Sequence, residues 1–103
     1  MPKRGFLRSP NYPQRYPNSH DSTQTIEVAE GKTIRLMWKR FSVEQGGDWV
    51  QIMDEDGTDL TPKLSGSLSL PRPIFSNSNI AHVNFHTDFS RQYTGWKLEW
   101  TEQ

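Results

Sequence analysis

Alternation of apolar and polar residues with a period of two constrains the fold of this chain more than any other feature. Ile34, Leu36 and Trp38 alternate with mostly polar residues, and Val50 and Ile52 continue this pattern further along the chain. Residues 81–86 and 96–101 alternate in the same way. Successive side chains of a strand point to opposite faces, so each stretch has one buried and one solvated face. We therefore expect antiparallel strands near residues 25–28, 33–41, 48–53, 80–87 and 96–101.

Clusters of turn-forming residues separate these stretches. They fall at 29–32, 45–47, 54–57, 71–73 and 77–79, and no segment keeps the i, i+3, i+4 apolar spacing of a helix. A chain of 103 residues is long enough for one core, which the aromatic residues can fill. The sequence predicts a single domain over residues 1–103, with an all-β fold of two antiparallel layers, a β-sandwich.

Charge and composition exclude several classes of function. The formal net charge is zero, which gives no sign of a nucleic-acid partner, and no apolar stretch is long enough for membrane insertion. The chain has no cysteine and its start lacks the apolar core of a signal peptide. Taken alone, these features favour a cytosolic protein or a domain excised from a larger precursor. Residues 41–60 carry six acidic and no basic residues, which by itself is typical of solvated turns.

No catalytic or zinc-binding pattern is evident. His82 and His86 are four residues apart on an expected strand, or about 13 Å, too far apart to share one zinc ion. Residues 54–59 resemble a calcium loop only faintly, and a hairpin turn explains them better. There is no Gly-x-Ser-x-Gly nucleophile motif. We expect a binding module and not an enzyme.

The opening GFLRSPNYPQRYPN, residues 5–18, resembles the N-terminal signature of the CUB domain family. GKTIRL at 31–36, FSVE at 41–44, DWVQI at 48–52, VNFHTDFS at 83–90 and TGW at 94–96 resemble further motifs of that family, in the same order. The resemblance implies a CUB-like jelly-roll sandwich used in extracellular recognition, as a domain of a larger secreted precursor. It also implies a protein or glycan partner, with any catalysis located elsewhere.

The resemblance further implies a Ca²⁺ site at one end of the sandwich. Its ligands map onto the carboxylates of Glu44, Asp48 and Asp88 and the backbone carbonyl of Ser90, with Tyr16 supporting the acidic side chains. Ca²⁺ takes six to eight oxygen ligands, and a cation relieves the repulsion between converging carboxylates. We expect Ca²⁺ as a cofactor, and a basic side chain of a protein partner bound by Glu44, Asp48 and Asp88.

Two other functions stay open. One is a calcium-independent structural or regulatory accessory domain of a larger secreted protease or receptor. The other is a module like the seminal-plasma adhesins, which binds a heparin-type glycan through Lys3, Arg4, Arg8 and Arg15. The identity of the ligand and the oligomeric state are not indicated by the sequence.

The chain departs from the family pattern at several positions. The family typically has two disulfides, but here Ser22 and Ser65 occupy cysteine positions and Gln24 that of a common tryptophan. Loss of a disulfide from a small secreted domain costs about 2–5 kcal/mol. The loop at 45–47 is short, and Arg91 stands where some members have an asparagine near the metal. Both features bear on whether the calcium geometry is kept.

Overall fold

Eight β-strands form the regular structure of the chain in a computed structural model that describes residues 3–12, 14–44, 47–67, 73–88 and 93–103. Within these ranges no α-helix occurs, as the absence of helical spacing predicts. The strands are β1 (Arg4–Arg8), β2 (Asp21–Glu27), β3 (Ile34–Val43), β4 (Trp49–Asp54), β5 (Gly66–Ser67), β6 (Ile74–Phe75), β7 (Ile80–His86) and β8 (Gly95–Glu102).

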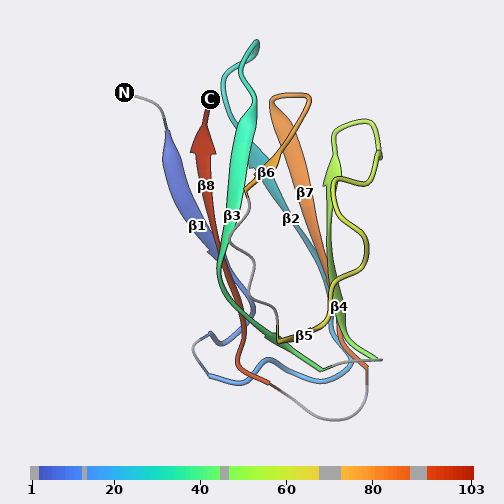
Figure 1. Cartoon of the computed structure of the whole chain (residues 1–103). Coiled ribbons are helices and arrows are strands. Elements are labelled where there is room, and N and C mark those ends of the chain that lie inside the picture. The colour runs from blue at the N-terminus through green and yellow to red at the C-terminus, as the bar shows by residue number, and fades with distance from the viewer. Residues whose placement is uncertain (1–2, 13, 45–46, 68–72, 89–92) are drawn as a thin grey trace.

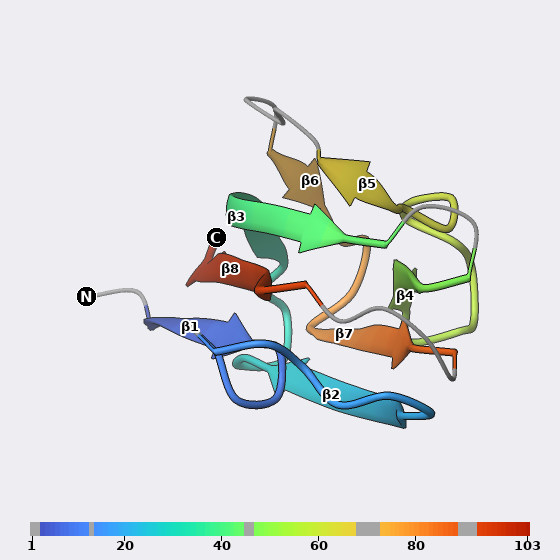
Figure 2. The same cartoon turned by 90° about the horizontal axis from the view of Figure 1, so that it is seen from below.

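The strands form two antiparallel sheets that face each other (Figures 1 and 2). One sheet has the order β1-β8-β3-β5, with β6 also paired to β3, and the other has the order β2-β7-β4. Every strand pair is antiparallel. The expected all-β sandwich of two antiparallel layers is therefore confirmed.

The apolar side chains of the alternating stretches meet between the two sheets. Ile34, Leu36 and Trp38 are buried along β3, and the corresponding positions of the other long strands complete the core. Aromatic rings join the layers. The ring centres of Phe85 in β7 and Trp96 in β8 are 5.9 Å apart, with the two rings edge to face. Such pairs add about 0.5–1.5 kcal/mol beyond the burial of their area.

The observed strands differ from the expected ones in length and number. β2 begins at Asp21, several residues before the expected start, and β3 continues to Val43. The short strands β5 and β6 lie in a region that the sequence treats as a long connection. Each has two residues, which is too few for an alternating pattern to reveal. Their pairing with β3 could therefore not be predicted from sequence periodicity.

The functional candidates gather where three connections meet at one end of the sandwich. The chain between β1 and β2, the turn between β3 and β4 and the chain leaving β7 come together at the lower end in Figure 1, opposite both termini. Within the described part of the chain, no helix is long and apolar enough to cross a membrane.

Candidate metal centre

Three carboxylates from separate connections converge at this end of the sandwich. Glu44 directly follows β3 and Asp48 directly precedes β4. Asp88 follows β7 after one intervening residue. Each offers an oxygen, and these oxygens lie within 4.8 Å of one another. The convergence follows from the register of β4 and β7. Trp49 pairs with His86, which brings the start of β4 beside the end of β7.

Two hydrogen bonds fix the buried carboxylate of Asp48. Its side chain is 2% exposed. Its Oδ1 accepts a hydrogen bond from the backbone N–H of Asp88 at 2.8 Å, and its Oδ2 accepts one from the Tyr16 hydroxyl at 2.5 Å. Buried carboxylates need such partners because desolvation disfavours their charge. Asp48 thereby couples the position of Asp88 to that of Tyr16.

Tyr16 supports the acidic side chains from the connection between β1 and β2. Its ring is fully buried and packs edge to face on Phe85 at 5.1 Å. The hydroxyl donates to Asp48 and accepts a hydrogen bond from the backbone N–H of Glu44 at 3.0 Å. Burial, and then the hydrogen bond to Asp48, raise the pKa of the Tyr16 phenol well above its ordinary value. The phenol therefore remains a proton donor at physiological pH.

Gly47 leaves the space that the Asp88 carboxylate fills. A Cβ atom built on Gly47 would overlap Oδ2 of Asp88. The family motifs did not indicate Gly47 as part of the site. The pair Gly46-Gly47 directly before an acidic residue was the available signal, since glycine is typical of positions where other groups approach the backbone closely.

The chemistry of the donor set fits Ca²⁺. Two oxygens bound to one Ca²⁺ at about 2.3–2.6 Å are at most about 5 Å apart. The three carboxylate oxygens meet this limit. Carboxylates are hard ligands, and a divalent cation between them offsets their mutual repulsion.

The structure also bears on the remaining expected residues. Ser90 and Arg91 lie outside the described residues, as do residues 45 and 46 of the short loop. His82 and His86 lie on the solvent side of β7, where they contact Thr25 and Asp21 of β2. Residues 54–59 form a turn closed by a hydrogen bond from Asp54 N to Thr58 O. Among described residues, only the Glu44, Asp48 and Asp88 group has a spacing suited to a metal ion.

Comparisons with known proteins find relatives that match nearly the whole of this chain. Rat cubilin is 32% identical over 103 residues, which is 94% of this chain, but the chain spans only 3% of the length of cubilin. A crystal structure of the MASP-1 CUB2 domain bound to Ca²⁺ is 29% identical, with a TM-score of 0.84 over 94% of this chain and 90% of that one. The full extracellular region of zebrafish Gpr126/Adgrg6 is 26% identical, with a TM-score of 0.86 over 96% of this chain and 13% of that one.

The family assignment rests on nearly the whole length of the chain. The family model for the CUB domain matches residues 1–100. The cysteine-free character, with serine at positions 22 and 65, does not prevent this match. The chain is a member of the CUB domain family.

Proposed function

We propose that the chain is a single, non-catalytic, extracellular recognition domain that binds Ca²⁺ and, at the same site, a basic side chain of a protein partner. Glu44, Asp48 and Asp88 bind the ion through their carboxylates, with the backbone carbonyl of Ser90 as a further ligand. Tyr16 orients Asp48. The ion supplies positive charge that holds the three carboxylates in one arrangement.

The convergence of the three carboxylates is the observation that carries this proposal. Their oxygens lie within 4.8 Å of one another although the residues are up to 44 positions apart in the sequence. Two backbone N–H groups and one phenol hold this arrangement. A cation between the three carboxylates offsets the repulsion between their like charges. The relative whose structure contains Ca²⁺ supports the choice of ion.

The same carboxylates are suited to bind an ammonium group. Glu44 and Asp88 are half-buried, so a partner side chain can reach them from solvent, whereas Asp48 lies deeper. Acceptors that are already fixed lose little entropy when a partner binds. Hydrogen bonds between charged groups are about twice as strong as those between neutral groups.

Binding to immobilised polylysine tests the proposal. We expect binding in millimolar Ca²⁺ that is lost in EDTA and lost in Glu44→Gln, and no binding to acetylated polylysine, which lacks the charge. Glu55→Gln removes one charge from an exposed turn of the acidic segment and should bind as the wild type does. Equal binding with and without Ca²⁺ would contradict the proposal and favour a calcium-independent accessory domain.

A further inference from the structure

A row of positive charges crosses the solvent-facing side of the β1-β8-β3 sheet. Arg8 of β1 pairs with Lys97 of β8, and Lys97 pairs in turn with Arg40 of β3. Residues directly opposite each other in adjacent strands point to the same face, and neighbouring strands are about 4.8 Å apart. The three cations therefore lie side by side over about 10 Å.

A β-bulge adds a fourth cation to the row. The register between β3 and β8 shifts between Trp38 and Arg40, so Lys39 is an extra residue. Without the bulge, strict alternation would turn one of two successive residues inward. With it, Lys39 and Arg40 are both exposed, and Trp38 and Phe41 on either side are both buried.

The charge on this face is largely uncompensated. The outward positions of β1, β3 and β8 include six Lys or Arg residues and one carboxylate, Glu99: the cations are Arg4, Arg8, Arg35, Lys39, Arg40 and Lys97. Glu99 contacts Lys39 at 3.5 Å and Arg4 at 4.0 Å. Within the described ranges, no carboxylate forms an ion pair with the row of Arg8, Lys97 and Arg40. Like charges directly opposite in a sheet are destabilising, so the row has an energetic cost that a bound anion would remove.

An aromatic ring positions two of these cations without neutralising them. Lys97 Nζ lies 4.5 Å from the centre of the Phe6 ring, and the Arg8 guanidinium carbon lies 5.9 Å from it. Cation–π contacts of this kind are worth about 0.5–1 kcal/mol at exposed sites. They hold the charges on the face while leaving the full positive charge available to a ligand.

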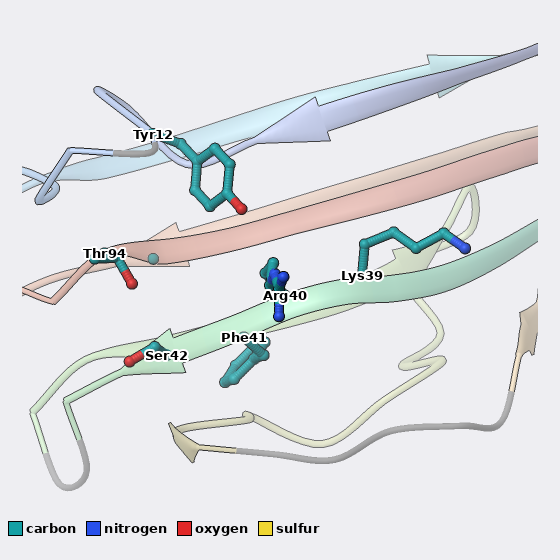
Figure 3. A pocket seen from close by; sticks show the side chains of 7 residues that line it. Tyr12, Lys39, Arg40, Phe41, Ser42 and Thr94 are labelled. Atoms are coloured by element: carbon teal, nitrogen blue, oxygen red, sulfur yellow. The ribbon is translucent and has the colours of Figure 1, made fainter.

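A hollow of about 470 Å³ lies next to the row (Figure 3). Three hydroxyl-bearing residues line it together with Lys39 and Arg40: Tyr12, Ser42 and Thr94. In Figure 3 these residues come from three separate segments, the connection after β1, strand β3 and the residue before β8. Hydroxyls donate and accept hydrogen bonds, and a tyrosine ring offers an apolar surface, which together suit a sugar unit.

We propose that this face binds a sulfated glycosaminoglycan, with its sulfate groups on Arg8, Lys97 and Arg40 and a sugar unit in the hollow beside Tyr12. Sulfate esters stay ionised at any working pH and recur along the chain, which matches a row of fixed cations. Arginine forms two parallel hydrogen bonds with such oxyanions. The site differs from the N-terminal cluster considered above, because it combines Arg8 with Lys97 and Arg40, which are far away in sequence.

Binding to immobilised heparin at 0.15 M salt tests this proposal. We expect the wild type to bind and the affinity to fall as salt rises, because salt screens the charges. Single replacements, Lys97→Gln or Arg40→Gln, should each weaken binding about threefold, and the triple variant Arg8→Gln/Lys97→Gln/Arg40→Gln at least about tenfold. The triple variant should melt close to the wild type, because the replacements remove both the like-charge repulsion and the cation–π contacts with Phe6.

Matched controls separate the possible outcomes. Lys32→Gln removes one exposed charge from the turn between β2 and β3 and should bind heparin as the wild type does. EDTA should leave heparin binding unchanged, so this result is independent of the metal centre. The proposal is overturned if the triple variant binds as tightly as the wild type, if EDTA abolishes binding, or if polyglutamate or desulfated heparin binds as tightly as heparin.

Discussion

At the scale of single residues, the metal centre depends on groups that are not themselves ligands. The Tyr16 hydroxyl links the carboxylate of Asp48 to the backbone N–H of Glu44. Gly47 leaves room for the carboxylate of Asp88. In each case a small change removes one interaction and keeps the surrounding packing, which makes the contribution of that interaction measurable.

Tyr16→Phe should lower both stability and calcium affinity. Phenylalanine keeps the buried ring against Phe85 but leaves an oxygen of Asp48 and the N–H of Glu44 without the hydroxyl. The loss of a buried hydrogen bond to a charged group costs about 1.5–3 kcal/mol, and loss of an outer-shell partner lowers metal affinity about 10–100-fold. Urea unfolding and calcium titration measure the two effects. Tyr93→Phe changes an exposed tyrosine and should alter neither; equal effects of the two variants would contradict the account.

Gly47→Ala should weaken calcium binding roughly tenfold or more, because the added Cβ displaces the Asp88 carboxylate from its position. Gly57→Ala is the matched control. Gly57 has a φ of +87° and nothing within 4 Å of an added Cβ, so alanine there strains the backbone without approaching the site. Calorimetry should show normal calcium binding for Gly57→Ala. Normal binding by Gly47→Ala would mean that this contact does not position Asp88.

At the scale of strands and turns, Asp54 ties the end of β4 to the connection before β7. Its side chain is 3% exposed. It accepts hydrogen bonds from the backbone of Glu55 and Asn77 and from the hydroxyl of Ser78. Burial opposes ionisation, but the hydrogen bonds from Ser78, Asn77 and Glu55 outweigh it and hold the pKa of Asp54 below its ordinary value. Asp54 is therefore a structural residue of the acidic segment and not a ligand.

Asp54→Asn should reduce the amount by which the free energy of unfolding falls on acidification. A carboxyl whose pKa is lower in the folded state contributes its full stabilisation above its ordinary pKa of about 4 and loses it as the pH falls through the folded value. The wild type should therefore lose more stability than the variant between about pH 5 and pH 3. Urea unfolding in EDTA at both pH values measures this difference. Asp59→Asn, in the same turn but exposed, should behave as the wild type does; parallel losses in wild type and Asp54→Asn would contradict the assignment.

The sequence predicted the elements with strong alternation and missed those without it. β4 and β7 bury every second side chain along their whole length, and β3 does so as far as Trp38. In β8 the apolar residues Trp96, Leu98 and Trp100 alternate with polar ones in the sequence, although Trp100 is only half-buried. The bulge at Lys39 was not predicted. One inserted residue changes the face to which the following side chains point, but it leaves no mark in the composition. The family resemblance identified Glu44, Asp48 and Asp88, but their approach to one another depends on the β4–β7 register, which periodicity does not specify.

At the scale of the whole molecule, the domain is held together without disulfides. Gln24, at a position where the family commonly has tryptophan, donates a hydrogen bond to the backbone of Arg8 and so joins the edges of the two sheets. The aromatic cluster of Tyr16, Phe85 and Trp96 spans both layers. These contacts join the two layers in a chain that has no cysteine.

Removal of calcium should therefore lower the melting temperature. At a dissociation constant of about 10⁻⁴ M, 1 mM Ca²⁺ stabilises the folded state by about 1.4 kcal/mol, which is roughly 6–11 °C for a domain of this size. Scanning calorimetry with 1 mM Ca²⁺ and with EDTA measures the shift. The same shift in Asp88→Ala would show that the stabilisation arises somewhere other than at this centre.

The most direct test of the account is a calorimetric titration of Ca²⁺ into the wild type and into Asp88→Ala. We expect one binding event per chain in the wild type, with a dissociation constant of about 10⁻⁴–10⁻³ M, and none in the variant. Identical heats for the two proteins, or no heat for either, would contradict the proposal that Glu44, Asp48 and Asp88 form a calcium site.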